Sequence, residues 1–239
     1  MNGQISLPAS FDFGTGPGQE DASNFVTTGP GIWKLESNSF NYESDTGLAS
    51  FSATDEFLNF GGNDFIITLV LSNNPALQAR FQDWSDEFGI IAGGGVAGNN
   101  GFAAVFRFNG TLIDSVLRIY EGGFGGSSFT EKTWGVAQSL EESYFMTLIG
   151  TYDGPDLNLE FTVLSENGKT ERMSATLAAA LYSGDYAGFG GVTQQKTIEF
   201  DTFTVVPEPS STAVLFGALG AALMLRRQRL SPAKPNHYS

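Results

Sequence analysis

The chain has 239 residues, no cysteine, one histidine (His237) and a net charge of −14. These features exclude disulfides, thiolate nucleophiles, Ser-His-Asp catalysis and the usual zinc sites, so an enzyme here would depend on carboxylates. The acidity belongs to residues 1–206, with 8 Lys+Arg and 25 Asp+Glu (−17), whereas the remainder holds 4 basic residues and Glu208 (+3); such a body repels phosphate, which argues against nucleic-acid binding.

Short apolar segments with a period of two predict β-strands along most of the chain. Turn formers such as Asn109-Gly110 and Asp153-Gly154-Pro155 separate them. The predicted strands lie, in chain order, around residues 51–60, 64–72, 87–94, 102–110, 115–123, 144–152, 157–165 and 196–206. So many strands and turns predict an all-β fold over residues 1–205, an antiparallel β-sandwich of the jelly-roll type.

Helical signals are weak. Residues 74–84 favour one or two helical turns after Pro75, and residues 173–185 favour a short helix because they are rich in alanine and leucine. Neither segment changes the predicted fold class.

Four segments carry a resemblance to a known fold. "IWKLESNSFNYES", "DFIITLVLS", "YFMTLIGTYDGPDLNLEF" and "IEFDTFTV" resemble, in this order, the strand signatures of concanavalin A-like and laminin-G-like jelly rolls. Those domains often close with an Asp-x-Phe-x-Val strand, like Asp201, Phe203 and Val205. The resemblance implies a domain that binds sugars or proteins and, in some members, hydrolyses glycans.

Three tryptophans, Trp33, Trp84 and Trp134, are the candidate ligand-binding residues, because an indole face suits the apolar side of a pyranose. Trp84 also has acidic neighbours that could accept hydrogen bonds from sugar hydroxyls or hold a calcium ion. Those neighbours are Asp83, Asp86 and Glu87. The alternative for each tryptophan is an ordinary place in the core.

Calcium (Ca2+) is the one candidate cofactor. Asp153, Asp156 and Asn158 bring oxygen donors to a tight turn, as a hard cation requires. The alternative is a plain hairpin turn, since six or more ligands would have to converge on the ion.

The resemblance also suggests an enzymatic alternative. Retaining glycosidases of this fold carry a Glu-x-Asp-x-x-Glu strand, whose carboxylates flank the glycosidic bond. Glu199 and Asp201 begin that pattern, but Thr204 occupies the position of the last acid. We therefore expect no catalytic residue, and keep a carboxylate-dependent glycan hydrolase as the competing hypothesis.

Residues 206–239 form a separate tail. The motif Pro207-Glu208-Pro209 precedes an uncharged apolar run, and Arg226, Arg227 and Arg229 follow it. The run predicts a short transmembrane helix over residues 212–225, with the arginines holding its end on the cytoplasmic side.

The tail resembles the PEP-CTERM sorting signal of Gram-negative bacteria. The resemblance implies export, transient insertion in the inner membrane, cleavage near Pro207-Glu208-Pro209 by an exosortase-type membrane enzyme, and delivery to the cell surface or extracellular matrix, where polysaccharide and biofilm are common partners. Two features depart from the family pattern: ten residues follow Arg229, and the sequence begins without an export signal, so we expect the true start to lie upstream.

Two functions outside catalysis follow from the sequence. We expect an exported surface or matrix protein whose sandwich binds carbohydrate without catalysis. A pure matrix scaffold without glycan affinity is the remaining alternative; its three tryptophans would all be buried.

Overall fold

The structure, a computed structural model of the whole chain, describes residues 7–13, 25–29, 32–36, 39–44, 49–54, 63–71, 86–94, 101–108, 115–123, 126, 128–135, 143–192 and 196–207. The chain divides into two units, Met1–Pro207 and Glu208–Ser239, and every described residue belongs to the first. The predicted tail helix and its basic end lie outside the described residues. Within the described ranges, no helix has the length and apolar character needed to cross a membrane.

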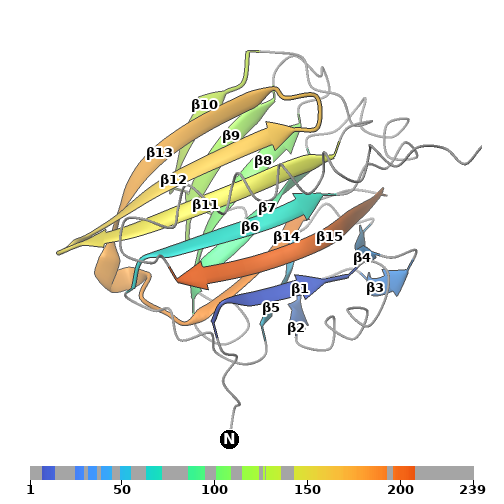
Figure 1. Cartoon of the computed structure of the whole chain (residues 1–239), viewed down its shortest axis with the longest axis horizontal. Helices are drawn as coiled ribbons and strands as arrows, with labels where there is room; N and C mark the ends of the chain where they lie inside the picture. Colours follow the sequence, from blue (N-terminus) through green and yellow to red (C-terminus); the bar gives the residue numbers. More distant parts are fainter. Residues whose placement is uncertain are drawn as a thin grey trace, which may run out of the picture. The chain divides into compact units, whose positions relative to one another are not determined.

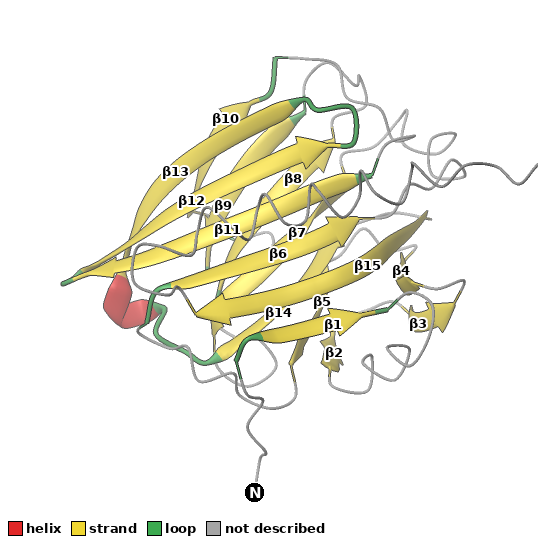
Figure 2. Cartoon of the chain, viewed as in Figure 1, coloured by secondary structure: helices red, strands yellow, loops and turns green. Residues whose placement is uncertain are grey.

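The described part of the chain is built almost entirely from strands (Figures 1 and 2). The strands are β1 (Ala9–Asp12), β2 (Phe25–Thr28), β3 (Ile32–Glu36), β4 (Ser39–Ser44), β5 (Ala49–Thr54), β6 (Phe65–Leu71), β7 (Asp86–Gly94), β8 (Phe102–Phe108), β9 (Val116–Glu121), β10 (Ser128–Thr133), β11 (Tyr144–Asp153), β12 (Asp156–Ser165), β13 (Thr170–Ala178), β14 (Tyr186–Val192) and β15 (Lys196–Pro207).

The strands form two sheets, and Figure 1 looks through one sheet at the other. The eight-stranded sheet has the order β13-β12-β11-β6-β15-β4-β3, and β1 also pairs with β15. The seven-stranded sheet has the order β10-β9-β8-β7-β14-β5-β2. Every pairing is antiparallel, so the predicted antiparallel β-sandwich is confirmed.

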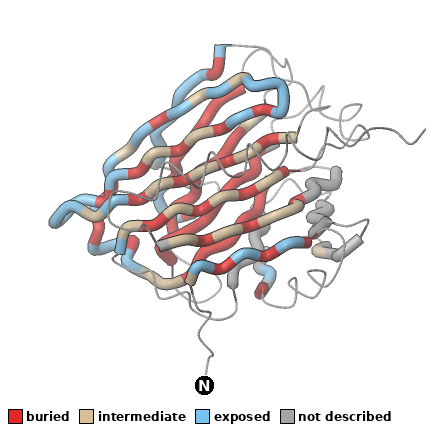
Figure 3. The backbone as a smooth tube through the Cα atoms, in the orientation of Figure 1, coloured by how far each residue is buried: buried red, intermediate tan, exposed pale blue. Residues whose placement is uncertain are grey.

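The core lies between the two sheets; strands β6, β11 and β12 of the eight-stranded sheet alternate between buried and more exposed residues, whereas β7, β8 and β14 of the other sheet are buried along most of their length (Figure 3). In β6 the alternation is complete, because every second residue from Phe65 to Leu71 is buried. Aromatic rings from distant parts of the chain meet in this core: Phe189 lies 5.3 Å from both Phe25 and Phe203, measured between ring centroids. Burying each such ring contributes roughly 1.5–3 kcal/mol, so the phenylalanine-rich composition supplies much of the core.

The short helix predicted over residues 173–185 is wrong. Residues up to Ala178 continue β13, and the segment contains only one turn of 3-10 helix, η3 (Ala179–Leu181) (Figure 2). Met173 and Leu177 are buried in β13, which pairs with β12 along nearly its whole length. This tertiary pairing overrides the helix propensity of the alanines. The other helical candidate, residues 74–84, lies outside the described residues.

Gly150 gives the centre of the eight-stranded sheet room for an aromatic ring. It lies on β11 directly opposite Phe65 of β6, and the Phe65 ring occupies the space that a side chain at position 150 would need. The Phe65 side chain is fully buried and packs near Phe102 and Tyr152, so it has nowhere to move. The absence of a side chain at position 150 is therefore a packing requirement.

Replacing Gly150 by alanine should destabilise the sandwich. The new Cβ would lie closer than 3.0 Å to the Phe65 ring, and overpacking of this kind costs about 1–3 kcal/mol. Gly135→Ala is the matched control, because a Cβ there meets nothing within 4 Å; we expect a change within about 0.5 kcal/mol. Urea unfolding of both variants measures the difference, and equal stabilities would contradict this account of the packing.

Candidate functional site

The seven-stranded sheet has an outward face with its own buried residues. On β8 and β9, alternate side chains point into the main core, and the intervening ones point away from it. Ala103, Val105 and Tyr120 form a second, smaller apolar cluster on this outward face. Side chains on this face are therefore packed and not simply solvated.

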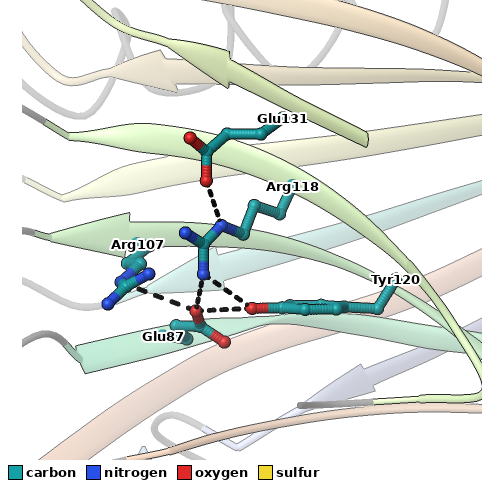
Figure 4. A network of polar contacts seen from close by, with 5 residues as sticks. All are labelled: Glu87, Arg107, Arg118, Tyr120 and Glu131. Carbon is teal, nitrogen blue, oxygen red and sulfur yellow. Dashed lines mark hydrogen bonds and ion pairs between the residues drawn. The ribbon is translucent and has the colours of Figure 1, made fainter. Parts of the chain in front are cut away.

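The strand register brings charged side chains together on the outward face. Glu87 of β7 lies opposite Arg107 of β8, and Arg118 of β9 lies opposite Glu131 of β10. Figure 4 shows these four residues with Tyr120, which follows Arg118 by two residues and so shares its face. We call Glu87, Arg107, Arg118, Tyr120 and Glu131 the ionic cluster.

One carboxylate oxygen is the centre of the ionic cluster. Glu87 Oε1 accepts a hydrogen bond from Arg118 Nη1 at 2.8 Å and another from the Tyr120 hydroxyl at 2.7 Å. Arg118 Nε donates to Glu131, and Arg118 Nη1 also contacts the Tyr120 hydroxyl at 2.9 Å. The side chains of Glu87 and Arg118 are only 8% and 13% exposed, so this ion pair is largely withdrawn from water.

Burial changes the proton affinity of the two central donors. Burial, together with the hydrogen bond to Glu87, raises the pKa of Tyr120 to about 12. Burial alone would lower the pKa of Arg118, but the hydrogen bonds with Tyr120 and Glu131 and the charge of Glu87 outweigh it, so the pKa is raised. The tyrosine is therefore a neutral donor at ordinary pH, and the two arginines and two glutamates balance in charge.

An exposed aromatic ring completes the site at the edge strand. The Phe129 ring of β10 is 47% exposed, and the Arg118 guanidinium carbon lies 4.6 Å from its centroid. Tyr120 contacts the same ring edge-on, with centroids 5.4 Å apart. A shallow hollow of about 390 Å³ adjoins this edge, between β10 and β13. Its lining residues are Thr130, Glu131, Lys132, Arg172, Met173 and Ser174.

This arrangement suits a ligand with one apolar face and a polar rim. The Phe129 ring offers a flat surface, while the nearby guanidinium and carboxylate groups offer a donor and an acceptor of hydrogen bonds. A sugar ring presents that combination of surfaces.

Two of the three predicted tryptophans, Trp33 and Trp134, lie within the described residues, and they pack against different aromatic rings. Trp134 is 2% exposed and packs against Phe106, with centroids 5.4 Å apart, so its indole belongs to the core, as the alternative interpretation held. Trp33 is partly buried and stacks on Phe200 at 5.9 Å. Trp84 lies outside the described residues.

The predicted calcium ligands lie at one hairpin. Asp153 and Asp156 are a directly opposed pair flanking the Gly154-Pro155 turn between β11 and β12, and both are exposed. The amide oxygen of Asn158 accepts a hydrogen bond from Thr176 at 2.8 Å. Among the described residues, no group of three or more histidine, cysteine, aspartate or glutamate side chains is placed to hold a metal ion. Calcium at this hairpin stays a prediction.

The carboxylates of the hydrolase hypothesis lie on β15, in the other sheet from the ionic cluster. Asp201 occupies a β-bulge, where the register with β6 shifts between Phe200 and Thr202. Burial, together with the charge of Asp12 on β1, raises the pKa of Asp201. Thr204, in the place of the third acid, lies 3.1 Å from the hydroxyl of Ser10. The side chain of Glu199 lies outside the described residues.

The sorting motif begins where the described structure ends. Pro207 is the last residue of β15 and pairs with Phe65 of β6. The other tail residues lie outside the described ranges. They are Glu208, Pro209, Arg226, Arg227 and Arg229.

Sequence reasoning missed most of the ionic cluster. Of its members, only Glu87 drew attention, as a neighbour of Trp84. A signal was present in "VLRIYE", because Arg118 and Tyr120 must share a face of a predicted strand that is otherwise apolar. The sequence did not show that Glu87 and Glu131, on two other strands, would lie beside them.

Comparisons with known proteins relate the fold to lectins. No protein-family sequence model matches the chain, and no curated protein sequence does. A legume lectin-like domain from Entamoeba histolytica matches 84% of this chain and 97% of its own, with a TM-score of 0.56 and 10% identity. The Lotus tetragonolobus seed lectin matches 85% and 100%, with a TM-score of 0.54 and 13% identity.

A third similar structure is a Bauhinia forficata lectin in complex with GalNAc, which matches 84% of this chain and 99% of its own, with a TM-score of 0.52 and 16% identity. At such low identities these matches show a legume-lectin-like fold and nothing finer. The predicted concanavalin A-like jelly roll is confirmed at this level.

The raised pKa of Tyr120 predicts a loss of stability in alkali. The folded protein keeps a proton until about pH 12, whereas the unfolded chain loses it at the ordinary tyrosine pKa of 10.0. The corresponding stabilisation is complete below pH 10 and should fall by up to about 2 kcal/mol as the pH rises to 12. Tyr120→Phe, which retains the other tyrosines, should lose less stability in urea unfolding across this window. Parallel losses in the two proteins would contradict the prediction.

Proposed function

We propose that the sandwich is a non-catalytic carbohydrate-binding domain of an exported protein. The likeness to lectins carries this proposal, because it extends over nearly the whole of each lectin and most of this chain. Fold alone leaves function open, and a surface site that suits a sugar is the second support for this proposal.

The proposed sugar site consists of the exposed Phe129 ring and the adjacent Glu131 of the ionic cluster. The exposed ring would stack on the apolar face of a pyranose, as aromatic side chains do in sugar recognition. Glu131 bonds Arg118 through one oxygen, and within the described residues its other oxygen has no hydrogen-bond partner, so it can accept a bond from a sugar hydroxyl. Arg118 holds both groups in place through its contacts with Phe129 and Glu131.

Export and sorting form the second part of the proposal. We propose that an exosortase-type enzyme of the inner membrane cuts the chain near Pro207-Glu208-Pro209, after which the domain reaches the cell surface or extracellular matrix of a Gram-negative bacterium and meets polysaccharide there. The position of Pro207 at the end of β15 supports this order of events. A cut beyond Pro207 would leave every described strand intact.

Truncating Phe129 should weaken glycan binding. We expect the full-length chain, in mild detergent, to bind at least one of a panel of immobilised neutral glucans, galactans and mannans, and Phe129→Ala to lower the affinity about tenfold, equivalent to ~1.4 kcal/mol. Leu181→Ala is the matched control, since Leu181 is another exposed apolar side chain (66%) far from the ionic cluster in sequence. Biolayer interferometry provides the measurement.

Two outcomes of this comparison would count against the proposal. If the wild-type chain binds no glycan of the neutral panel and none of a second panel of acidic glycans, the matrix-scaffold alternative is favoured. Equal weakening by Phe129→Ala and Leu181→Ala would place the binding site elsewhere on the sandwich.

Changing Glu208 should block processing of the tail. In a host with an exosortase, we expect the mature wild-type protein to end near Pro207 to Ser210 and to lie outside the inner membrane. Glu208→Ala should keep the intact C-terminus and stay in the membrane fraction, whereas Glu166→Ala, an acidic change within the sandwich, should not alter processing. Mass spectrometry of the C-terminus in separated cell fractions measures where each protein ends and in which fraction it lies. Wild-type protein that keeps Ser239 in the membrane would mean that the tail is only an anchor.

A further inference from the structure

The Arg107 side chain is the least used donor group of the ionic cluster. Its Nε is buried and has no hydrogen-bond partner among the described residues. Its ion-pair partner among the described residues is Glu87, whose Oε1 lies 3.6 Å from Nε, within ion-pair distance but beyond a normal hydrogen bond. A buried donor left without a hydrogen bond destabilises the protein, so a ligand that supplied an acceptor would be favoured.

The two hydrogen bonds at Glu87 Oε1 explain why Arg107 has no hydrogen bond to that oxygen. Glu87 Oε1 already accepts hydrogen bonds from Arg118 and from the Tyr120 hydroxyl. One carboxylate oxygen has about two lone-pair sites, and these two donors fill them. Arg107 therefore interacts electrostatically with Glu87 without a hydrogen bond to Oε1.

The two arginines of the cluster differ in their roles. Arg118 contacts two carboxylates, a hydroxyl and two aromatic rings, which commits it to holding the cluster together. Within the part of the chain that the structure describes, the one ion pair of Arg107 is the long contact with Glu87, and its side chain is 25% exposed, about twice as much as that of Arg118. Arg107 is thus the arginine that can reach a ligand.

The chemistry of a guanidinium group specifies the kind of ligand. Its planar fork of N–H donors matches a carboxylate or sulfate with two parallel hydrogen bonds, and charge makes each bond about twice as strong as one to a neutral hydroxyl. Nε is one arm of such a fork. Consecutive contacts of 4.6, 2.8 and 3.6 Å link Phe129 through Arg118 and Glu87 to Arg107, so an acidic group and a stacked sugar ring can belong to one oligosaccharide.

We propose that the sugar site prefers acidic glycans, and that Arg107 binds the carboxylate of a uronate residue while Phe129 stacks on a pyranose ring. This inference rests on the proposed function. The preference cannot come from long-range attraction, because residues 1–206 carry a net charge of −17 and repel a polyanion. It depends on the contact at Arg107, and therefore persists when about 0.15 M salt screens distant charges.

The test compares glycans that differ only in charge. Polygalacturonate and alginate are each immobilised beside their carboxyl-reduced forms, which keep the linkages and lose the acid. In about 0.15 M salt, we expect the full-length chain to bind at least one acidic polymer about tenfold more tightly than its reduced form. Arg107→Gln should bring that ratio close to one.

Two further variants sharpen the test. Arg107→Lys keeps the charge and loses the fork, so it should restore only part of the preference. Lys169→Gln is the control for the loss of one positive charge: Lys169 lies in the turn between β12 and β13, outside the ionic cluster and the lining of the hollow, and its loss should leave the ratio unchanged. Thermal melting checks that every variant folds.

The outcomes separate this inference from the proposed function. If wild type binds neutral glycans and loses them with Phe129→Ala, but does not prefer the acidic polymers, the function stands and the role of Arg107 is wrong. Arg107→Gln that keeps the preference also overturns the role. A chain that binds neither form of either polymer, nor any neutral glycan, overturns both.

Discussion

The last strand of the sandwich is the element on which the eight-stranded sheet depends. β15 pairs with β6 along one edge, while its other edge pairs first with β4 and then with β1. The β-bulge at Asp201 marks the change of partner, and it lets both Phe200 and Phe203 point into the core. The first strand and the last strand therefore meet in one sheet, and the core is complete only when residues nearly 200 apart in sequence have paired.

Burying the ionic cluster in the seven-stranded sheet costs desolvation free energy. Removing charged groups from water can outweigh their mutual attraction, so a buried ion pair is weak evidence of stabilisation. Its geometry does specify register, since Glu87, Arg118 and Glu131 come from β7, β9 and β10 and would separate if any of these strands slipped by one residue. A fixed register is what a binding site built across several strands requires.

Sequence periodicity predicted the strands whose inward residues are large and apolar, such as β6, β11 and β12. It missed β14, whose sequence "YAGFGGV" contains three glycines and no apolar alternation to detect. It misassigned β13, where small alanines favoured a helix until pairing with β12 decided otherwise. The site was harder to predict, because alternation shows that Arg118 and Tyr120 share a face but not which strands lie beside them.

The edge position of β10 explains why a binding site would lie there. On the outward face of the seven-stranded sheet, side chains are buried at β7 and become exposed toward β10, where Phe129 and Glu131 lie. Lys132 of the same strand pairs with Glu171 at 2.7 Å and donates a hydrogen bond to the Arg172 carbonyl, so β10 is tied to β13 of the other sheet. These contacts across the sandwich hold an otherwise free edge strand in position. The Phe129 ring is thereby both accessible and held in place, which lowers the conformational entropy that this side chain would lose when a sugar binds.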